Sequence, residues 1–162
     1  MTKKMYFSFL DFFKKNEKLC KSLIILEKFI EISIYIAYPV FLFMLLIKGN
    51  DLWIESALVC GIGFIAVSFL RNKLNAPRPY ELYEFSPLIK KDTSGKSFPS
   101  RHCFCATIIA LNIATQNLFI GIILGVMTFI MAFLRVILGV HFIKDVSFGI
   151  FLGIIIGAII LI

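Results

Sequence analysis

The sequence predicts an all-α, integral-membrane helical bundle with about five transmembrane helices and an N-terminal helix in the membrane interface. Hydrophobic residues make up 59% of the 162 positions, whereas soluble domains are nearer half apolar. A helix needs roughly 20 mostly apolar residues to cross a bilayer. Five stretches approach this length: 30–48, 52–70, 102–117, 118–134 and 146–162. The last two each hold 17 residues without a formal charge, which a buried soluble core explains poorly.

The N-terminal segment, residues 1–21, is predicted to form an amphipathic helix that lies in the interface. Met5, Phe9 and Phe13 recur at helical spacing, with lysine and aspartate between them. A solvated tail is the alternative. Charged residues interrupt the apolar stretch, so we expect no removable signal peptide. We expect this segment and the apolar runs that follow it to form a single membrane domain over residues 1–162.

Residues 71–101 form the only long loop that the sequence predicts. Four of the five prolines lie in it, together with Ser94-Gly95, and these residues are turn signals. Seven of its residues are Lys or Arg and three are acidic. A loop of this length within a compact domain is usually functional. Counting the spans puts the loop on the same membrane face as the end of the fourth run and the start of the fifth, so we expect one site there.

The two histidines each lie in a polar array at the edge of an apolar run. His102 closes the segment 98–102, and His141 follows Arg135 by six residues and precedes Asp145 by four. In a helix, His141 and Asp145 would lie one turn apart on one face. A carboxylate bonded to one imidazole nitrogen fixes the tautomer and raises the basicity of the other, as a nucleophilic histidine requires. Taken singly, Asp145 fits a helix N-cap and Arg135 a snorkelling boundary residue equally well.

Arginine side chains supply the second half of the predicted site. Guanidinium groups bind phosphate oxygens in bidentate fashion, and several cations stabilise the charge that spreads over a phosphoryl group in its transition state. Ser100 adds a hydroxyl donor, and His102 is placed to protonate a leaving oxygen. The predicted phosphate-binding residues are Arg71, Arg78, Ser100, Arg101 and Arg135.

These arrays resemble the signature of the type 2 phosphatidic-acid phosphatase superfamily, whose relatives include glucose-6-phosphatase and the vanadium haloperoxidases. The signature reads Lys-x6-Arg-Pro, then Pro-Ser-Gly-His, then Ser-Arg-x5-His-x3-Asp. In this chain the three parts are Arg71-x6-Arg78-Pro79, Pro99-Ser100-Arg101-His102 and Leu134-Arg135-x5-His141-x3-Asp145. Three parts in this order, over residues 71–145 of a multispan chain, make a specific match.

The resemblance implies a membrane phosphatase that acts without a metal or other cofactor. His141 would attack phosphorus and become transiently phosphorylated, Asp145 would orient it, and His102 would protonate the leaving group. The five phosphate-binding residues named above would hold the phosphate of a lipid phosphate or a polyprenyl or lipid diphosphate, among membrane lipids.

The chain departs from the signature at three positions. The family has lysine, glycine and serine where this chain has Arg71, Arg101 and Leu134. The changes bear on phosphate geometry and substrate range more than on the basic chemistry. The alternative function is a catalytically inactive membrane protein that binds lipid phosphates or serves as a scaffold, in which Arg101 spoils the phosphate loop.

Other function classes fit the sequence less well. The net charge is +7, but the positive residues flank membrane spans, where they set topology or attract anionic lipid, so we expect no nucleic-acid partner. A zinc site is a further alternative with unusual ligand spacing. Its candidate ligands are His102, Cys103, Cys105, His141 and Asp145. Otherwise we expect the four cysteines to be packing residues.

The lysines bear on the orientation of the chain. Seven of them lie in residues 1–28, on the same face as the site if there are five spans. The positive-inside rule then places both in the cytoplasm, whereas members of the resembled family more often act on the outer face. We expect a multi-pass protein of a bacterial cytoplasmic (inner) membrane. No motif indicates an oligomeric state.

Overall fold

The computed structural model describes residues 3–89 and 94–161, and every regular element in these residues is a helix. The predicted all-α class is therefore confirmed. The elements in chain order are α1 (Lys3–Lys15), α2 (Glu17–Ile47), α3 (Leu52–Leu74), α4 (Pro79–Leu82), α5 (Arg101–Gln116), α6 (Leu118–Ile137), α7 (Ile143–Gly157) and the 3-10 helix η1 (Ala158–Leu161).

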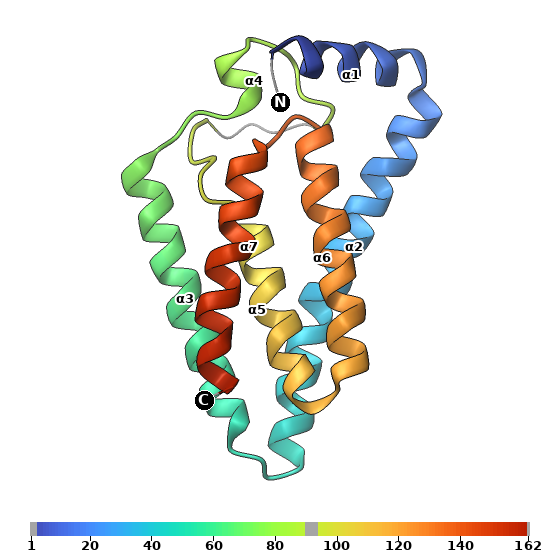
Figure 1. Ribbon diagram of the computed structural model, residues 1–162. Helices are drawn as coiled ribbons and strands as arrows, with labels where there is room; N and C mark the ends of the chain where they lie inside the picture. The colour runs from blue at the N-terminus through green and yellow to red at the C-terminus, as the bar shows by residue number, and fades with distance from the viewer. Residues whose placement is uncertain (1–2, 90–93, 162) are drawn as a thin grey trace.

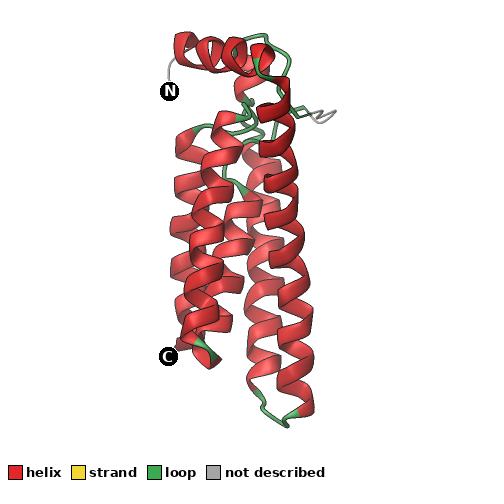
Figure 2. Cartoon of the chain, turned by 90° about the vertical axis from the view of Figure 1, so that its right-hand side faces the viewer, coloured by secondary structure: helices red, strands yellow, loops and turns green. Residues whose placement is uncertain are grey.

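Five of the helices, α2, α3, α5, α6 and α7, run side by side as a bundle (Figures 1 and 2). Helix α1 lies across one end of this bundle, together with α4 and the loop that leads to α5 (Figure 1). Short turns join α2 to α3 and α5 to α6 at the opposite end, where the C-terminus also lies. The polar arrays of the sequence therefore gather at the end that α1 covers.

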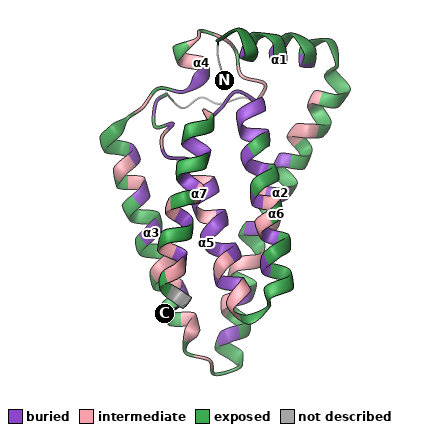
Figure 3. Cartoon of the chain, in the orientation of Figure 1, coloured by how far each residue is buried: buried purple, intermediate pink, exposed green. Residues whose placement is uncertain are grey.

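The outer faces of the bundle are apolar and exposed, whereas α5 is buried along most of its length (Figure 3). Large side chains such as Phe119, Ile47 and Phe69 point outward. Contiguous apolar surface of this kind is typical of a protein face that contacts membrane lipid. The main hydrophobic core lies inside, between α2, α5 and α6, and includes Ile34 and Ile109.

Three segments, those of α2, α3 and α6, are long and apolar enough to cross a membrane. The other two expected spans form α5 and α7, which contain 16 and 15 residues and fall short of the roughly 20 that a full span needs. Both helices begin after irregular segments, 94–100 and 138–142, that carry polar residues into the end of the bundle. Five helices thus make the bundle, and three of them meet the length and composition of a span.

Helix α1 crosses the end of the bundle as a separate amphipathic helix, but its buried face differs from the expected one. The buried side chains are Tyr6, Leu10 and Phe13, whereas Met5 is 47% exposed. Phe13 is buried as part of both sets, whereas Tyr6 and Leu10 are buried in place of Met5 and Phe9, and Tyr6 has hydrogen-bond and ring partners beyond α1. The helix also ends earlier than residue 21, because Asn16 leaves helical geometry before α2 begins.

Glycines bring α7 into close contact with α5. A Cβ added at Gly153 would lie 2.7 Å from Thr107 Cβ and 2.9 Å from the Phe104 carbonyl oxygen. Gly149 and Gly157 also face α5 at distances that leave no room for a Cβ. A four-residue spacing of small residues is typical of helices whose backbones approach closely in membranes, and Gly149, Gly153 and Gly157 show that spacing here.

We predict that Gly153→Ala lowers the thermal stability of the protein, whereas Gly125→Ala, on the open surface of α6, does not. Alanine in a helix gains about 1 kcal/mol over glycine, and nothing lies within 4 Å of a Cβ at Gly125. At Gly153 the clash with α5 costs roughly 1–3 kcal/mol. Thermal unfolding in detergent, followed by circular dichroism, measures both. Equal melting temperatures for the two variants would contradict the close packing of α5 and α7.

Candidate active site

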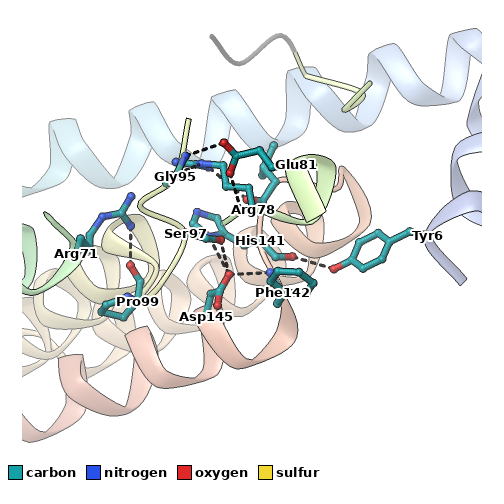
Figure 4. Close-up of polar contacts among 11 residues, drawn as sticks. Tyr6, Arg71, Arg78, Glu81, Gly95, Ser97, Pro99, His141, Phe142 and Asp145 are labelled. Atoms are coloured by element: carbon teal, nitrogen blue, oxygen red, sulfur yellow. Dashed lines mark hydrogen bonds and ion pairs between the residues drawn. The ribbon is translucent and has the colours of Figure 1, made fainter. Parts of the chain in front are cut away.

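The three polar arrays of the sequence are joined by hydrogen bonds at the end of the bundle under α1 (Figure 4). Arg71, in the last turn of α3, donates through Nη1 to the carbonyl of Pro99 at 2.6 Å. Arg78, just before α4, donates through Nη1 to the carbonyl of Val140 at 3.2 Å. Each arginine of the first array therefore holds the backbone of another array.

The second and third arrays are joined in the same way. The N–H of Ser100, at the start of α5, donates to the carbonyl of Asp145 in the first turn of α7, at 2.9 Å. Together with the arginine contacts, this bond brings the segments that carry Ser100, His102 and His141 to the same end of the bundle. The shared location that span counting predicted is thus observed.

His141 and Asp145 form a buried pair, with 1% and 0% of their side-chain surfaces exposed. His141 Nδ1 lies 3.6 Å from Asp145 Oδ2. Ser97 bridges the two, because its hydroxyl donates to Asp145 Oδ2 at 2.5 Å and lies 3.4 Å from His141 Nδ1. With Nδ1 turned to the carboxylate and the hydroxyl, Nε2 is the nitrogen that can act on a substrate.

Asp145 also bonds to the start of its own helix. Its Oδ2 accepts the N–H of Phe142, the N-cap residue of α7, at 2.9 Å. Of the two interpretations that the sequence left open, the partner of His141 is observed, whereas the N-cap position belongs to Phe142 and Asp145 lies three residues further on, in the first turn. The bond to Phe142 fixes the carboxylate on rigid backbone, which keeps it in place beside the imidazole.

His141 lies in the segment between α6 and α7, where its surroundings affect its charge. Burial lowers the pKa of His141, and the charges of Arg78 and Arg135 act in the same direction, against the opposing effect of Asp145. The imidazole is therefore held in its neutral form. Only a neutral imidazole carries the lone pair that a nucleophile needs.

Two buried polar atoms of the predicted phosphate-binding residues have no hydrogen-bond partner among the residues that the structure describes. They are the hydroxyl oxygen of Ser100 and Nε of Arg135. Most buried polar groups in proteins are hydrogen-bonded, so such atoms call for an explanation. Both belong to residues that the sequence predicts to bind phosphate, and both would be satisfied by an oxygen-rich anion.

Arg101 is oriented differently from the other predicted phosphate-binding residues. Its guanidinium lies over the ring of Phe64, 5.0 Å from the ring centroid, and Nη1 is 3.5 Å from the Ser68 hydroxyl. Both partners belong to α3. A role for Arg101 in phosphate binding stays a prediction. Leu134, the third departure from the signature, packs in the core and contributes no polar atom.

The contribution of α1 to the site was not predicted from the sequence. The hydroxyl of Tyr6 donates to the backbone carbonyl of His141 at 3.1 Å. The Tyr6 ring lies among Tyr83, Phe85 and Phe142, with centroids 5.8 to 6.2 Å apart. Burial raises the pKa of Tyr6, so the phenol stays a hydrogen-bond donor. The one feature of the sequence that could have indicated this contact is the presence of aromatic residues close to the polar arrays, namely Tyr83, Phe85 and Phe142.

Three acidic residues at the site were not predicted from the sequence either. Glu81 of α4 accepts the backbone N–H groups of Arg78 and Gly95, at 2.7 and 2.8 Å. Burial alone would raise the pKa of Glu81, but these two N–H groups and further hydrogen bonds lower it below its ordinary value. The other two, Glu27 and Glu31 of α2, contact Arg135. Their spacing of four residues beside an apolar run was an available signal.

The described residues contain no group of three or more His, Cys, Asp or Glu side chains arranged to hold a metal ion. The five candidate zinc ligands therefore do not gather into one site. Cys20, Cys60, Cys103 and Cys105 are all free thiols, and Cys103 is packed among buried apolar side chains. This placement agrees with a packing role.

Solved structures resemble this fold along almost the whole chain. Aquifex aeolicus LpxE matches with a TM-score of 0.68 and 29% identity, covering 89% of this chain and 93% of that one. A transmembrane PAP2-type phosphatidylglycerolphosphate phosphatase from Bacillus subtilis matches with a TM-score of 0.60 and 23% identity, covering 97% and 90%. Among curated protein sequences, none matches.

The amino-acid sequence itself matches the model of a known family. The PAP2 superfamily model matches residues 52–162, a segment that begins with α3 and contains all three polar arrays. The motif resemblance pointed to the same superfamily. Since the match covers more than half of the chain, this integral-membrane protein belongs to the PAP2 superfamily.

Proposed function

We propose that this protein is a membrane phosphatase that removes phosphate from a lipid phosphate, or from a polyprenyl or lipid diphosphate, through a phosphohistidine intermediate. One observation carries the proposal: a buried, neutral His141 beside Asp145 lies in a site to which three arginines of different segments belong. The Bacillus subtilis protein of similar fold is by its title a phosphatidylglycerolphosphate phosphatase. We also propose a bacterial cytoplasmic membrane as its location.

The phosphate is bound by cations and by hydroxyl and N–H donors. Arg71 and Arg78 are buried and already fixed by backbone carbonyls. Arg135 and Ser100 supply the two donors without a described partner. Such preorganised charge stabilises the transferring phosphoryl group without rearrangement during the reaction. Arg101 joins these ligands only if its side chain turns away from Phe64.

In the first step, His141 Nε2 attacks phosphorus while the bond from phosphorus to the leaving oxygen breaks. His102 gives its proton to that oxygen, and Asp145 stabilises the charge that develops on His141. In the second step, water attacks the phosphorus of the phosphohistidine and gives a proton to His102. Inorganic phosphate leaves, and both histidines return to their starting protonation states.

The position of the site supports a lipid substrate. It lies at one end of the bundle, beside the amphipathic helix α1. At that depth a bilayer presents the phosphate groups of its lipids, while the acyl chains extend along the apolar helices. A phosphate-release screen across lipid phosphates with the purified protein identifies the preferred substrate.

We predict that His141→Ala abolishes phosphate release and that Asp145→Asn lowers kcat by on the order of 10²–10⁴. The first variant loses the nucleophile, and the second loses the carboxylate that orients it. Phosphate release from purified protein in detergent or vesicles measures both. Asp51→Asn, an exposed change at the opposite end of the bundle, is the matched control. Near-normal turnover by His141→Ala would remove the nucleophile from the mechanism.

We predict that activity is retained in EDTA and is inhibited by vanadate. Arginines neutralise the phosphate in the proposed site, and vanadate imitates the transition state of phosphoryl transfer, which the site binds better than the substrate. The measurement is phosphate release with each reagent. A loss of activity in EDTA that added divalent metal restores would contradict the proposal.

We predict that Tyr6→Phe lowers kcat up to about tenfold, because one neutral hydrogen bond to the backbone of His141 is worth about 1 kcal/mol. Tyr83→Phe, in the same aromatic cluster, is the control, since no hydrogen bond from its hydroxyl supports His141. Steady-state kinetics on one lipid phosphate separates the two. An equal loss in both variants would show that the Tyr6 hydroxyl has no special role.

A further inference from the structure

Helix α2 brings two carboxylates to the site from outside the family-matched residues 52–162. Glu31 contacts two proposed site residues, one with each oxygen. Its Oε1 lies 3.1 Å from Nε2 of His102, and its Oε2 lies 3.0 Å from Nη2 of Arg135. Glu27, one turn earlier, places Oε1 2.6 Å from the same Nη2.

Acidic residues in apolar helices are costly and are retained where they pair with a specific partner. Glu27 fits a structural role, because its side chain and that of Arg135 are 6% and 3% exposed and neutralise each other. Glu31 is not needed for that purpose, since Arg135 is already paired. It is 26% exposed, and its second oxygen reaches the imidazole proposed to act as the acid.

We propose that Glu31 is a positioning residue for the leaving-group step, holding His102 by Nε2 so that the imidazole is oriented and protonated when phosphoryl transfer begins. This inference rests on the proposed function. A carboxylate at 3.1 Å favours the imidazolium form. With Nε2 on Glu31, His102 gives its proton to the leaving oxygen through Nδ1.

The two imidazoles of the site have different tasks and different degrees of burial. His141 must be neutral to attack, and it is buried near Arg78 and Arg135. His102 must be charged to donate, its side chain is 20% exposed, and the acidic group facing it is Glu31, with the Tyr35 ring 6.3 Å away. Arg135 shares Glu31 with His102, and Arg101 precedes His102 in the chain. Burial therefore suits His141 as the nucleophile, and the contact with Glu31 suits His102 as the acid.

A comparison of Glu31→Gln with Glu27→Gln distinguishes a loss of the contact with His102 from a general loss of structure. In Glu31→Gln, Arg135 keeps its 2.6 Å contact with Glu27, so the phosphate-binding arginine stays in place. In Glu27→Gln, His102 keeps its contact with Glu31. The first variant therefore tests the proton donor, and the second tests the hold on Arg135.

A double-mutant cycle on kcat/KM for a lipid monophosphate tests the link to His102. We expect Glu31→Gln to lower kcat/KM about 10- to 100-fold, and the double variant His102→Ala/Glu31→Gln to lie within about threefold of His102→Ala alone. Glu55→Gln, an exposed change in the first turn of α3, is the control and should match the wild type. A double variant that falls by the product of the two single effects would overturn the proposal, as would wild-type kinetics in Glu31→Gln.

A second measurement uses the leaving group. p-Nitrophenyl phosphate releases a stable anion that needs little protonation, so Glu31→Gln should lower its kcat/KM less than about threefold. Glu27→Gln should lower both substrates by the same factor, mainly through KM. Equal losses on both substrates in Glu31→Gln would reduce Glu31 to a structural residue. If the wild type releases phosphate from neither substrate, the proposed function itself fails. The double-mutant cycle can be measured on the lipid monophosphate even if the wild type does not hydrolyse p-nitrophenyl phosphate.

Discussion

The contact between the N-terminal ends of α5 and α7 determines where the proposed catalytic groups lie. The Ser100 N–H bonds to the carbonyl of Asp145 at 2.9 Å, and a Cβ at Gly149 would lie 2.5 Å from the Ser100 carbonyl oxygen. Two helix ends are thus pressed together with no side chain between them. This contact holds the start of α5, which carries His102, against the first turn of α7, which follows His141.

Charge is the second constraint, because the site buries three arginines at the end of an apolar bundle. Each of them has a fixed acceptor: Pro99 for Arg71, Gly95 and Val140 for Arg78, and the α2 carboxylates for Arg135. An unpaired buried charge would cost several kcal/mol. The acceptors offset part of that cost and also hold the guanidinium groups in fixed positions before any anion arrives, which is what electrostatic preorganisation requires.

Much of this arrangement could be predicted from the sequence, because it depends on local spacing. In the structure His141 and Asp145 lie side by side, the glycines of α7 pack against α5, and the three polar arrays meet at one end of the bundle. Contacts between distant residues could not be predicted. Tyr6 and His141 are 135 positions apart, and Glu31 and Arg135 are 104 apart, so no periodicity relates them. The orientation of Arg101 could not be predicted from the sequence either, since its partners Phe64 and Ser68 belong to a neighbouring helix.

The place of α1 has a practical consequence for handling the protein. The N-terminal helix crosses the end of the bundle that contains the site, whereas the C-terminus lies at the other end (Figure 1). Tyr6 is only a few residues into the chain and already contacts the backbone of His141. An affinity tag or fluorescent fusion at the N-terminus would therefore disturb the mouth of the site, and the same tag at the C-terminus would leave it open.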